Sequence, residues 1–316
     1  MNRPCFLFQL SAICLGAMLL SAPTAGFDLL RPIEESFPPG IGIGDVEATK
    51  EGLPEAAEPS YEDQLIELVN HERWSNGQLA PLKRADLLDT SSETHSSNMA
   101  ARDFVMHCDP DTFTMPWDRM VAAGYNYSSA GENIAWGYPD PSAVIAGWMA
   151  SSGHRANILS TTYREMGNGY YNQAGDQGNV RRTTSTGCTP NVFNEGPFYR
   201  YWTQNFGKRS SVYPLVINRE AYLTDIRDVD LYLYNGGTEI RLRNESGTWT
   251  TWQPYAGNLS WQLSPGNGTK TVSVEMRTGS TVRSSSDTII LEGASDLIFE
   301  DDFDSGFTSA WSAVIS

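Results

Sequence analysis

Residues 95–111 read HSSNMAARDFVMHCDPD, and the strings AGENIAWGY at 130–138 and GWMASSGHRANIL at 147–159 follow them. These three strings hold three of the four histidines of the chain and one glutamate, namely His95, His107, His154 and Glu132. A single histidine is more often a hydrogen-bonded structural residue than a ligand. The pattern of helices and strands around the strings decides whether these side chains can meet.

The segments around these strings alternate between helical and extended patterns. Ser60 is a typical N-cap before an apolar helical stripe, and the sequence predicts further helices over 85–104, 116–123 and 141–151. Aromatic-rich strands are expected at 165–171 and 199–206, and the polar, Gly-rich residues 172–198 are expected to form a long loop. Helices that flank a small antiparallel sheet predict an α+β layered domain.

The order of the motifs resembles that of a known family. The three strings quoted above, together with PWDRMVAAGY, YREMGNGY and YWTQNFG, are similar to the pattern of bacterial CAP-domain proteins, the cysteine-rich secretory, antigen 5 and pathogenesis-related group also called SCP-like. The similarity covers about residues 61–208. It implies an α-β-α sandwich, which we assign to residues 60–209 and which agrees with the predicted helices and strands.

The resemblance also implies a site. In this family a cleft is lined by two histidines and two acids, which bind a divalent metal in some members. His107, Glu132 and His154 match three of these positions, whereas Ser151 stands where the second acid is expected. The residues expected next to the cleft are His95, Asn133, Ser151 and Arg155.

Three chemical interpretations of this trio stay open. Two imidazoles and one carboxylate can hold zinc with an open fourth position, as in catalytic zinc sites. The same side chains can share protons, with His107 or His154 titrating near neutral pH. In the third interpretation Glu132 only orders its surroundings through hydrogen bonds. Zinc or another divalent cation is the one cofactor that the sequence suggests.

The pattern changes after residue 209. Period-two runs separated by Gly- and Pro-containing turns predict an all-β sandwich over 210–292. Residues 244–277 are similar to immunoglobulin-like or fibronectin-type-III-like modules appended to exported bacterial proteins. Three tryptophans, Trp249, Trp252 and Trp261, are expected in the sandwich core rather than on a carbohydrate-binding surface. We expect the two domains to fold separately when the chain is cut near Ser210.

Both ends of the chain suggest export. Residues 1–26 combine Arg3, an apolar run and small residues, as secretory signal peptides do. Residues 27–59 form an acidic, Pro-rich linker, and 293–316 form an acidic tail similar to motifs that end many secreted bacterial chains. No other stretch is long and apolar enough to cross a membrane. The predicted location is extracellular or in the cell envelope.

Two cysteines remain after the predicted signal peptide. An even number of cysteines and an oxidising destination predict a disulfide between Cys108 and Cys188. The alternative is two unpaired small residues.

The net charge of −16 comes mainly from the two terminal segments, so it indicates neither nucleic-acid binding nor attraction to anionic lipid. Three functions remain: a binding protein for a metal, lipid, peptide or cell-envelope ligand; a metal-assisted hydrolase of peptide or wall polymer; or an interaction protein with a vestigial cleft. We favour the binding protein over an enzyme, because Ser151 replaces an acid of the cleft.

Overall fold

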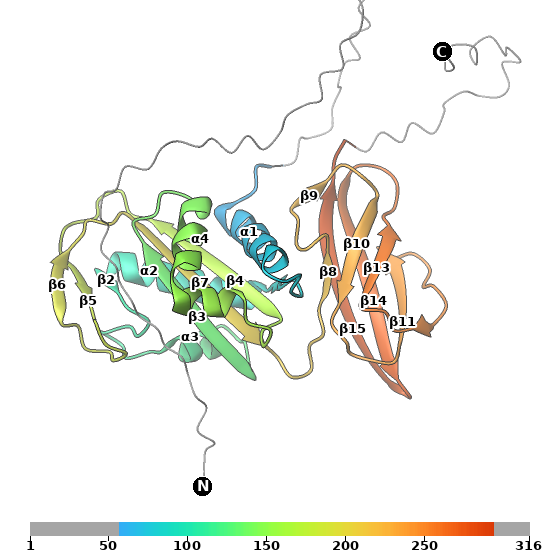
Figure 1. Cartoon of the computed structure of the whole chain (residues 1–316), viewed down its shortest axis with the longest axis horizontal. Helices are drawn as coiled ribbons and strands as arrows, with labels where there is room; N and C mark the ends of the chain where they lie inside the picture. The colour runs from blue at the N-terminus through green and yellow to red at the C-terminus, as the bar shows by residue number, and fades with distance from the viewer. Residues whose placement is uncertain (1–56, 294–316) are drawn as a thin grey trace, which may run out of the picture. The chain divides into compact units, whose positions relative to one another are not determined.

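The computed structural model describes residues 57–293 (Figure 1). The predicted signal peptide, nearly all of the linker and nearly all of the acidic tail lie outside these residues. The helices are α1 (Tyr61–Ser75), α2 (Asp86–Ala101), α3 (Pro116–Ala122), α4 (Pro141–Ala150) and α5 (Ser152–Ile158). Among the described residues, none of these helices has the length and apolar character needed to span a bilayer.

Helix α1 begins where its cap residues predict. The Ser60 hydroxyl accepts a hydrogen bond from the Asp63 backbone N–H at 3.1 Å, and an Asp63 carboxylate oxygen accepts one from the Ser60 N–H at 3.0 Å. This reciprocal pair satisfies two backbone donors that the first turn of a helix leaves unpaired. One face of α1 then packs against the core through the buried side chains of Leu65, Ile66 and Val69.

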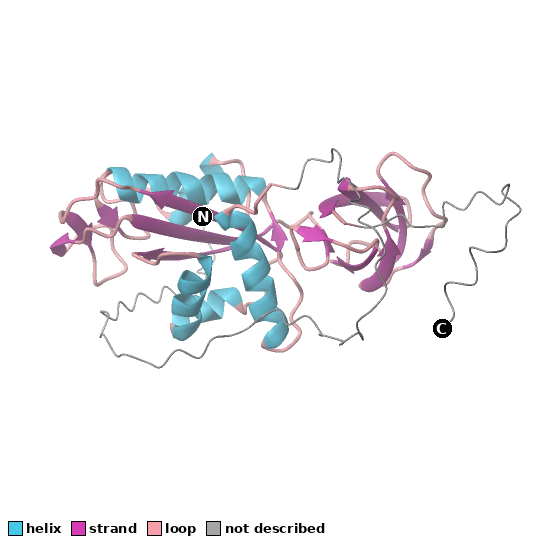
Figure 2. Ribbon diagram, turned by 90° about the horizontal axis from the view of Figure 1, so that it is seen from above, coloured by secondary structure: helices cyan, strands magenta, loops and turns pink. Residues whose placement is uncertain are grey.

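The sheet of the first domain has the order β1-β4-β7-β3. Its strands are β1 (Lys83–Arg84), β4 (Glu165–Asn172), β7 (Arg200–Lys208) and β3 (Ser129–Trp136). Helices lie on both sides of this sheet, as Figure 2 shows. One apolar cluster joins the sheet to α1, α4 and α5, and two others join it to α2 and α3. The predicted α-β-α sandwich is therefore confirmed.

Two glycines of β4 explain how closely α2 approaches the sheet. A Cβ atom on Gly167 would lie 2.2 Å from the Asp89 backbone nitrogen, and one on Gly169 would lie 2.2 Å from that of Glu93. Ser96 also donates its hydroxyl hydrogen to the Gly169 carbonyl at 2.9 Å. The alternation of glycines in EMGNGY is thus required by backbone-to-backbone packing of helix on strand.

The segment predicted as one long loop contains two strands. A small sheet has the order β2-β5-β6, with β2 (Phe104–Val105), β5 (Val180–Arg182) and β6 (Val192–Glu195). The loop prediction was wrong over these strands, because they are short and their side chains show no alternating apolar pattern. The predicted disulfide between Cys108 and Cys188 is confirmed, and it joins this segment to the chain just after His107.

The second domain is entirely β-structure. Its strands are β8 (Leu215–Ile217), β9 (Leu223–Thr224), β10 (Asp228–Leu233), β11 (Glu239–Asn244), β12 (Gln253–Pro254), β13 (Asn258–Gln262), β14 (Gly268–Thr278) and β15 (Thr281–Leu291). They form two sheets, β13-β10-β8 and β12-β11-β14-β15-β9, which share one apolar cluster. The β-rich architecture agrees with the sequence prediction.

The three tryptophans of this domain have different environments. Trp261 packs against the apolar cluster and donates its indole N–H to Asn244 at 2.6 Å. Trp249 and Trp252 instead stack on arginines: the Arg243 guanidinium lies 4.4 Å from the Trp249 ring, and that of Arg277 lies 4.2 Å from the Trp252 ring. The core interpretation was wrong for these two, which are half-buried and have arginine guanidinium groups over their rings.

Candidate functional site

His107 and Glu132 meet although 25 residues separate them. His107 follows β2 in a short bend, and Glu132 lies in the middle of β3. The Nδ1 atom of His107 lies 2.8 Å from a carboxylate oxygen of Glu132. Because a carboxylate only accepts hydrogen bonds, Nδ1 carries the hydrogen in this contact, and the other ring nitrogen, Nε2, takes no part in it.

Arg119 completes this contact and was not predicted. It lies on α3, in the PWDRM string, and donates from one guanidinium nitrogen to the second Glu132 oxygen at 2.7 Å. Its other terminal nitrogen donates to the carbonyl oxygens of His107 at 3.0 Å and of Thr114 at 3.1 Å. Arg119 therefore fixes both Glu132 and the backbone that carries His107. The string PWDRM was recognised as part of the motif, but nothing in it marked the arginine as the partner of a distant glutamate.

The electrostatics of Glu132 follow from these contacts. Burial alone would raise the pKa of this carboxyl, which is only 7 % exposed. The opposing influence of Arg119 and His95 and the hydrogen bond from His107 lower the pKa to about 2. Glu132 is thus an ionised carboxylate at neutral pH, held between a guanidinium and an imidazole.

His95 lies in the core beside this group. Its side chain is fully buried on α2, and Nε2 lies 2.9 Å from the Met106 carbonyl oxygen. Burial, with a smaller contribution from the charge of Arg119, lowers the pKa of His95 to about 3. A neutral imidazole can donate from Nε2 to that carbonyl, so His95 fixes the residue before His107 and is a structural neighbour of the site.

His154 lies on α5, a separate short helix beyond the end of the helix predicted over 141–151. Burial, followed by the charge of His107, lowers the pKa of His154 to about 4. His154 is therefore a neutral imidazole at physiological pH. The hydrogen bond from Asn133, the neighbour of Glu132 in β3, to the His154 carbonyl oxygen holds α5 beside that strand.

Asn133 connects β3 to the helix that carries His154. Its side-chain nitrogen donates to the His154 carbonyl oxygen at 3.2 Å and to Gln204 at 3.1 Å. Its side-chain oxygen accepts from Asn157 at 2.9 Å, and Asn157 also donates to the Glu132 carbonyl oxygen at 3.2 Å. These buried amides fix α5 against the strand that carries Glu132.

The other two predicted neighbours make different contacts. Ser151 joins α4 to α5, and its backbone N–H donates to the Trp148 carbonyl oxygen at 3.1 Å. Arg155 points to α1, where its guanidinium donates to Asn76 at 2.7 Å. Arg155 thus stabilises the packing of α5 on α1, and no contact joins its side chain to His107 or Glu132 among the described residues.

Comparison with known proteins decides the family of this domain. Residues 66–206 match the CAP family, described as the cysteine-rich secretory protein family. The first domain is a CAP domain.

Relatives of this CAP domain occur in Bacillus subtilis (strain 168). The chain is 40 % identical over 111 residues to the uncharacterized protein YkwD, a match that covers 35 % of this chain and 42 % of that protein. It is 32 % identical over 116 residues to the uncharacterized membrane protein YlbC, covering 35 % of this chain and 33 % of that protein. The similarity thus spans less than half of each curated relative.

Solved structures show more distant similarity. An extracellular protein containing an SCP domain from Bacillus anthracis is 24 % identical, with a TM-score of 0.36, over 47 % of this chain and 40 % of the other. An outer surface protein of Borrelia burgdorferi is 17 % identical, with a TM-score of 0.35, over 47 % of this chain and 93 % of the other.

The arrangement in this CAP domain does not fit the zinc site with three protein ligands that the sequence suggested. Both Glu132 oxygens are already used, one by His107 and one by Arg119. A cation bound to Glu132 would lie close to the Arg119 guanidinium, whose positive charge repels it. Among the residues that the structure describes, no group of three or more His, Cys, Asp or Glu side chains is arranged to hold a metal ion. Glu132 orients His107 here, as carboxylates commonly orient an imidazole through its second nitrogen.

Proposed function

We propose that this chain is an exported binding protein whose CAP domain holds a lipid, peptide or other cell-envelope ligand at the His107, Glu132 and His154 site. The observation that supports this most is the contact of Glu132 with both His107 and Arg119. It fixes the orientation of the His107 ring and leaves Nε2 free for hydrogen bonding with a ligand. A neutral His154, whose carbonyl oxygen accepts a hydrogen bond from Asn133 next to Glu132, offers a second imidazole.

Hydrolysis is the weaker candidate. A catalytic imidazole needs a nucleophile or an activated water within hydrogen-bonding distance. In the part of the chain that the structure describes, the His107 ring hydrogen-bonds only to Glu132, with no hydroxyl or thiol partner. Ser151, the one hydroxyl residue among the predicted site residues, occupies the junction between α4 and α5.

Export is supported by the sequence at residues 1–26 and by the disulfide between Cys108 and Cys188. Disulfides persist in oxidising compartments and are rare in the reducing cytosol. The ligand is therefore expected outside the cytoplasmic membrane.

Co-sedimentation with purified cell-wall sacculi and with phosphatidylglycerol vesicles tests the proposal. We expect the wild-type protein to bind one of these materials, and we expect His107→Ala and His154→Ala to bind it at least about tenfold more weakly. His71→Ala is the matched control, because His71 is exposed on α1 and lies outside the site. Equal binding by all four proteins would contradict the proposal.

Product analysis of the same samples separates binding from turnover. We expect no new amino or carboxyl groups to appear in the wall material after prolonged incubation with the wild-type protein. Release of new amino groups that is lost in His107→Ala would show that the site hydrolyses the wall peptide, and the hydrolase would then be the better account.

A further inference from the structure

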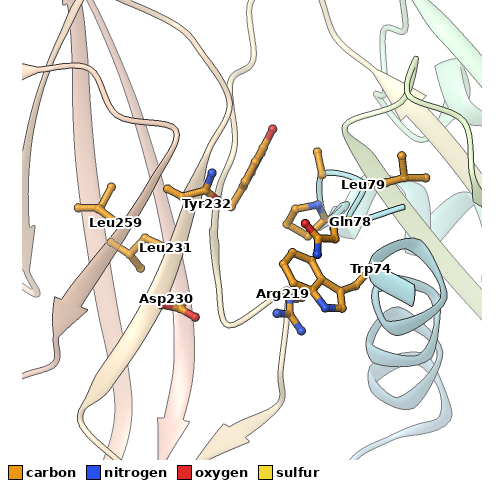
Figure 3. Close-up of a pocket in the computed structure, with 11 residues that line it drawn as sticks. Trp74, Gln78, Leu79, Arg219, Asp230, Leu231, Tyr232 and Leu259 are labelled. Carbon is orange, nitrogen blue, oxygen red and sulfur yellow. The ribbon is translucent and has the colours of Figure 1, made fainter. Parts of the chain in front are cut away.

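A second candidate site lies where the CAP domain meets the β domain. A pocket of about 390 Å³ is lined by the end of α1 and the turn after it, by the turn that follows β8, and by strands β10 and β13. Figure 3 shows Trp74, Gln78 and Arg219 on one side of this pocket and Leu231 and Leu259 on the other. All the lining residues belong to one compact unit of the chain.

Arg219 is a cation without a hydrogen-bonding partner in this pocket. Its guanidinium lies 3.9 Å from the centre of the Trp74 ring, and Trp74 is 41 % exposed. Within residues 57–293 the guanidinium forms no ion pair or hydrogen bond. Stacking on an indole holds a guanidinium flat and leaves the N–H groups at its edge available to a planar anion.

The backbone around Arg219 holds this side chain in place. Asn218, Arg219 and Glu220 have successive φ angles of 43°, 58° and 66°, a left-handed conformation that non-glycine residues rarely adopt. The Arg219 carbonyl oxygen accepts a hydrogen bond from Asn70 of α1 at 2.9 Å, and Glu220 forms an ion pair with Lys83 at 2.8 Å. Unfavourable backbone conformations of this kind are often found at ligand-binding sites.

The remaining walls combine apolar and amide side chains. Leu79, Tyr232 and Leu259 provide partly exposed apolar surface, whereas Gln78 and Asn258 provide exposed amides. A single carboxylate, Asp230, also lines the pocket. One cation, one nearby anion, apolar surface and amides are the features expected of a small-molecule or peptide site.

We propose that this pocket binds the carboxylate end of a short apolar peptide. A carboxylate matches the planar fork of Arg219, which can donate two parallel hydrogen bonds to it. A doubly charged phosphate fits less well, because the pocket has one guanidinium and Asp230 would repel the second charge. The amides of Gln78 and Asn258 favour a peptide over a fatty acid, since an alkyl chain offers them no hydrogen bonds. This inference does not depend on the function proposed for the His107 site.

Calorimetric titration with the acetylated tripeptide Ala-Leu-Leu tests the proposal. We expect the free-acid peptide to bind one-to-one, and we expect its C-terminal amide, octanoate and inorganic phosphate to bind at least about tenfold more weakly. We expect Arg219→Gln to lose the preference for the acid over the amide. This variant should fold, because the Arg219 side chain forms no hydrogen bond in the described structure.

Arg243→Gln is the matched control, because Arg243 also stacks on a tryptophan, Trp249, outside the pocket. We expect it to bind the acid as the wild type does. Absence of binding by the free-acid peptide, or equal binding of the acid and amide forms, would overturn the proposal. So would binding by Arg219→Gln that equals that of the wild type, or tighter binding of octanoate or phosphate than of the peptide.

Discussion

Glu132 is the residue on which the geometry of the CAP site depends. Its two oxygens bind His107 and Arg119, and its side chain is almost completely buried. Replacing it by glutamine leaves the Arg119 guanidinium without its counter-ion in the interior. We expect Glu132→Gln to lower the free energy of unfolding at pH 7 by about 3–5 kcal/mol, as measured by urea denaturation.

A surface ion pair provides the control for that experiment. Glu195 accepts from Arg182 at 2.7 Å but remains partly exposed. We expect Glu195→Gln to cost less than about 1 kcal/mol, because solvent screens exposed pairs. If the two variants lost equal stability, Glu132 would have no special structural role.

The stability of the folded chain should depend on pH through His154. Its pKa falls from 6.5 to about 4 on folding, because burial and then the charge of His107 disfavour protonation. The unfolded chain therefore takes up a proton at a higher pH than the folded chain does. The contribution of this group to stability is complete above pH 6.5 and is lost as the pH falls from 6.5 towards 4.

His154→Gln should remove that part of the acid sensitivity. We expect the variant to lose about 2 kcal/mol less stability than the wild type between pH 7 and pH 4.5, as measured by urea denaturation at both values. Identical losses in the two proteins would mean that folding does not lower the pKa of His154.

At the scale of elements, the disulfide joins the segment after β2 to the loop between β5 and β6. Cys108 and Cys188 are 80 residues apart, and β2, β5 and β6 near them have two to four residues each. The chain-entropy argument gives about 4 kcal/mol for closing a loop of this length. We expect Cys108→Ser with Cys188→Ser to lose up to that amount, as measured by thermal and urea unfolding.

Thiol titration supplies the direct check of this bond. The mature protein, denatured without reductant, should contain no reactive thiol. Two reactive thiols per chain, with the double variant as stable as the wild type, would contradict the disulfide.

Some helices and strands could be predicted from the sequence, and others could not. Caps, apolar stripes and aromatic-rich runs in the sequence predict helices α1 to α4 and strands β4 and β7. Several of the family motifs coincide with these elements. Strand β3 was missed although it carries Glu132. Four consecutive residues from Glu132 to Ala135 are buried there, and two of them are polar, so neither alternation nor an apolar run marks a strand.

Helix α5 and Arg119 were missed for related reasons. The helix has seven residues and contains Gly153, so its helical pattern is too short to recognise. The role of Arg119 arises only when α3 packs against β3. The local sequence pattern of neither segment predicts this contact.

At the scale of the whole molecule, the two domains share a buried cluster of charges. Lys83 of β1 forms ion pairs with Glu220, at 2.8 Å, and with Asp287 of β15. Burial and the nearby Asp287 raise the pKa of Glu220, while Lys83 opposes this effect. The sequence predicted a domain boundary near Ser210 but gave no sign of this contact across it, and separate folding of the two domains remains a prediction.

We expect Lys83→Met to lower the free energy of unfolding by about 3–5 kcal/mol, because two buried carboxylates lose the cation that they share. Adding Glu220→Gln and Asp287→Asn to that variant should restore part of the loss, since the unpaired charges are then removed. Urea denaturation of the three proteins checks this. An unchanged stability of Lys83→Met would mean that the cluster does not join the domains.

We propose that Glu132 of the CAP site orients His107 instead of binding a metal. Calorimetric titration of the wild type, His107→Ala and His154→Ala with zinc at neutral pH tests this most directly. We predict that the wild type shows no one-to-one zinc binding at micromolar protein concentration and that the variants behave as it does. Stoichiometric binding by the wild type that is lost in both variants would contradict the account and restore the zinc site.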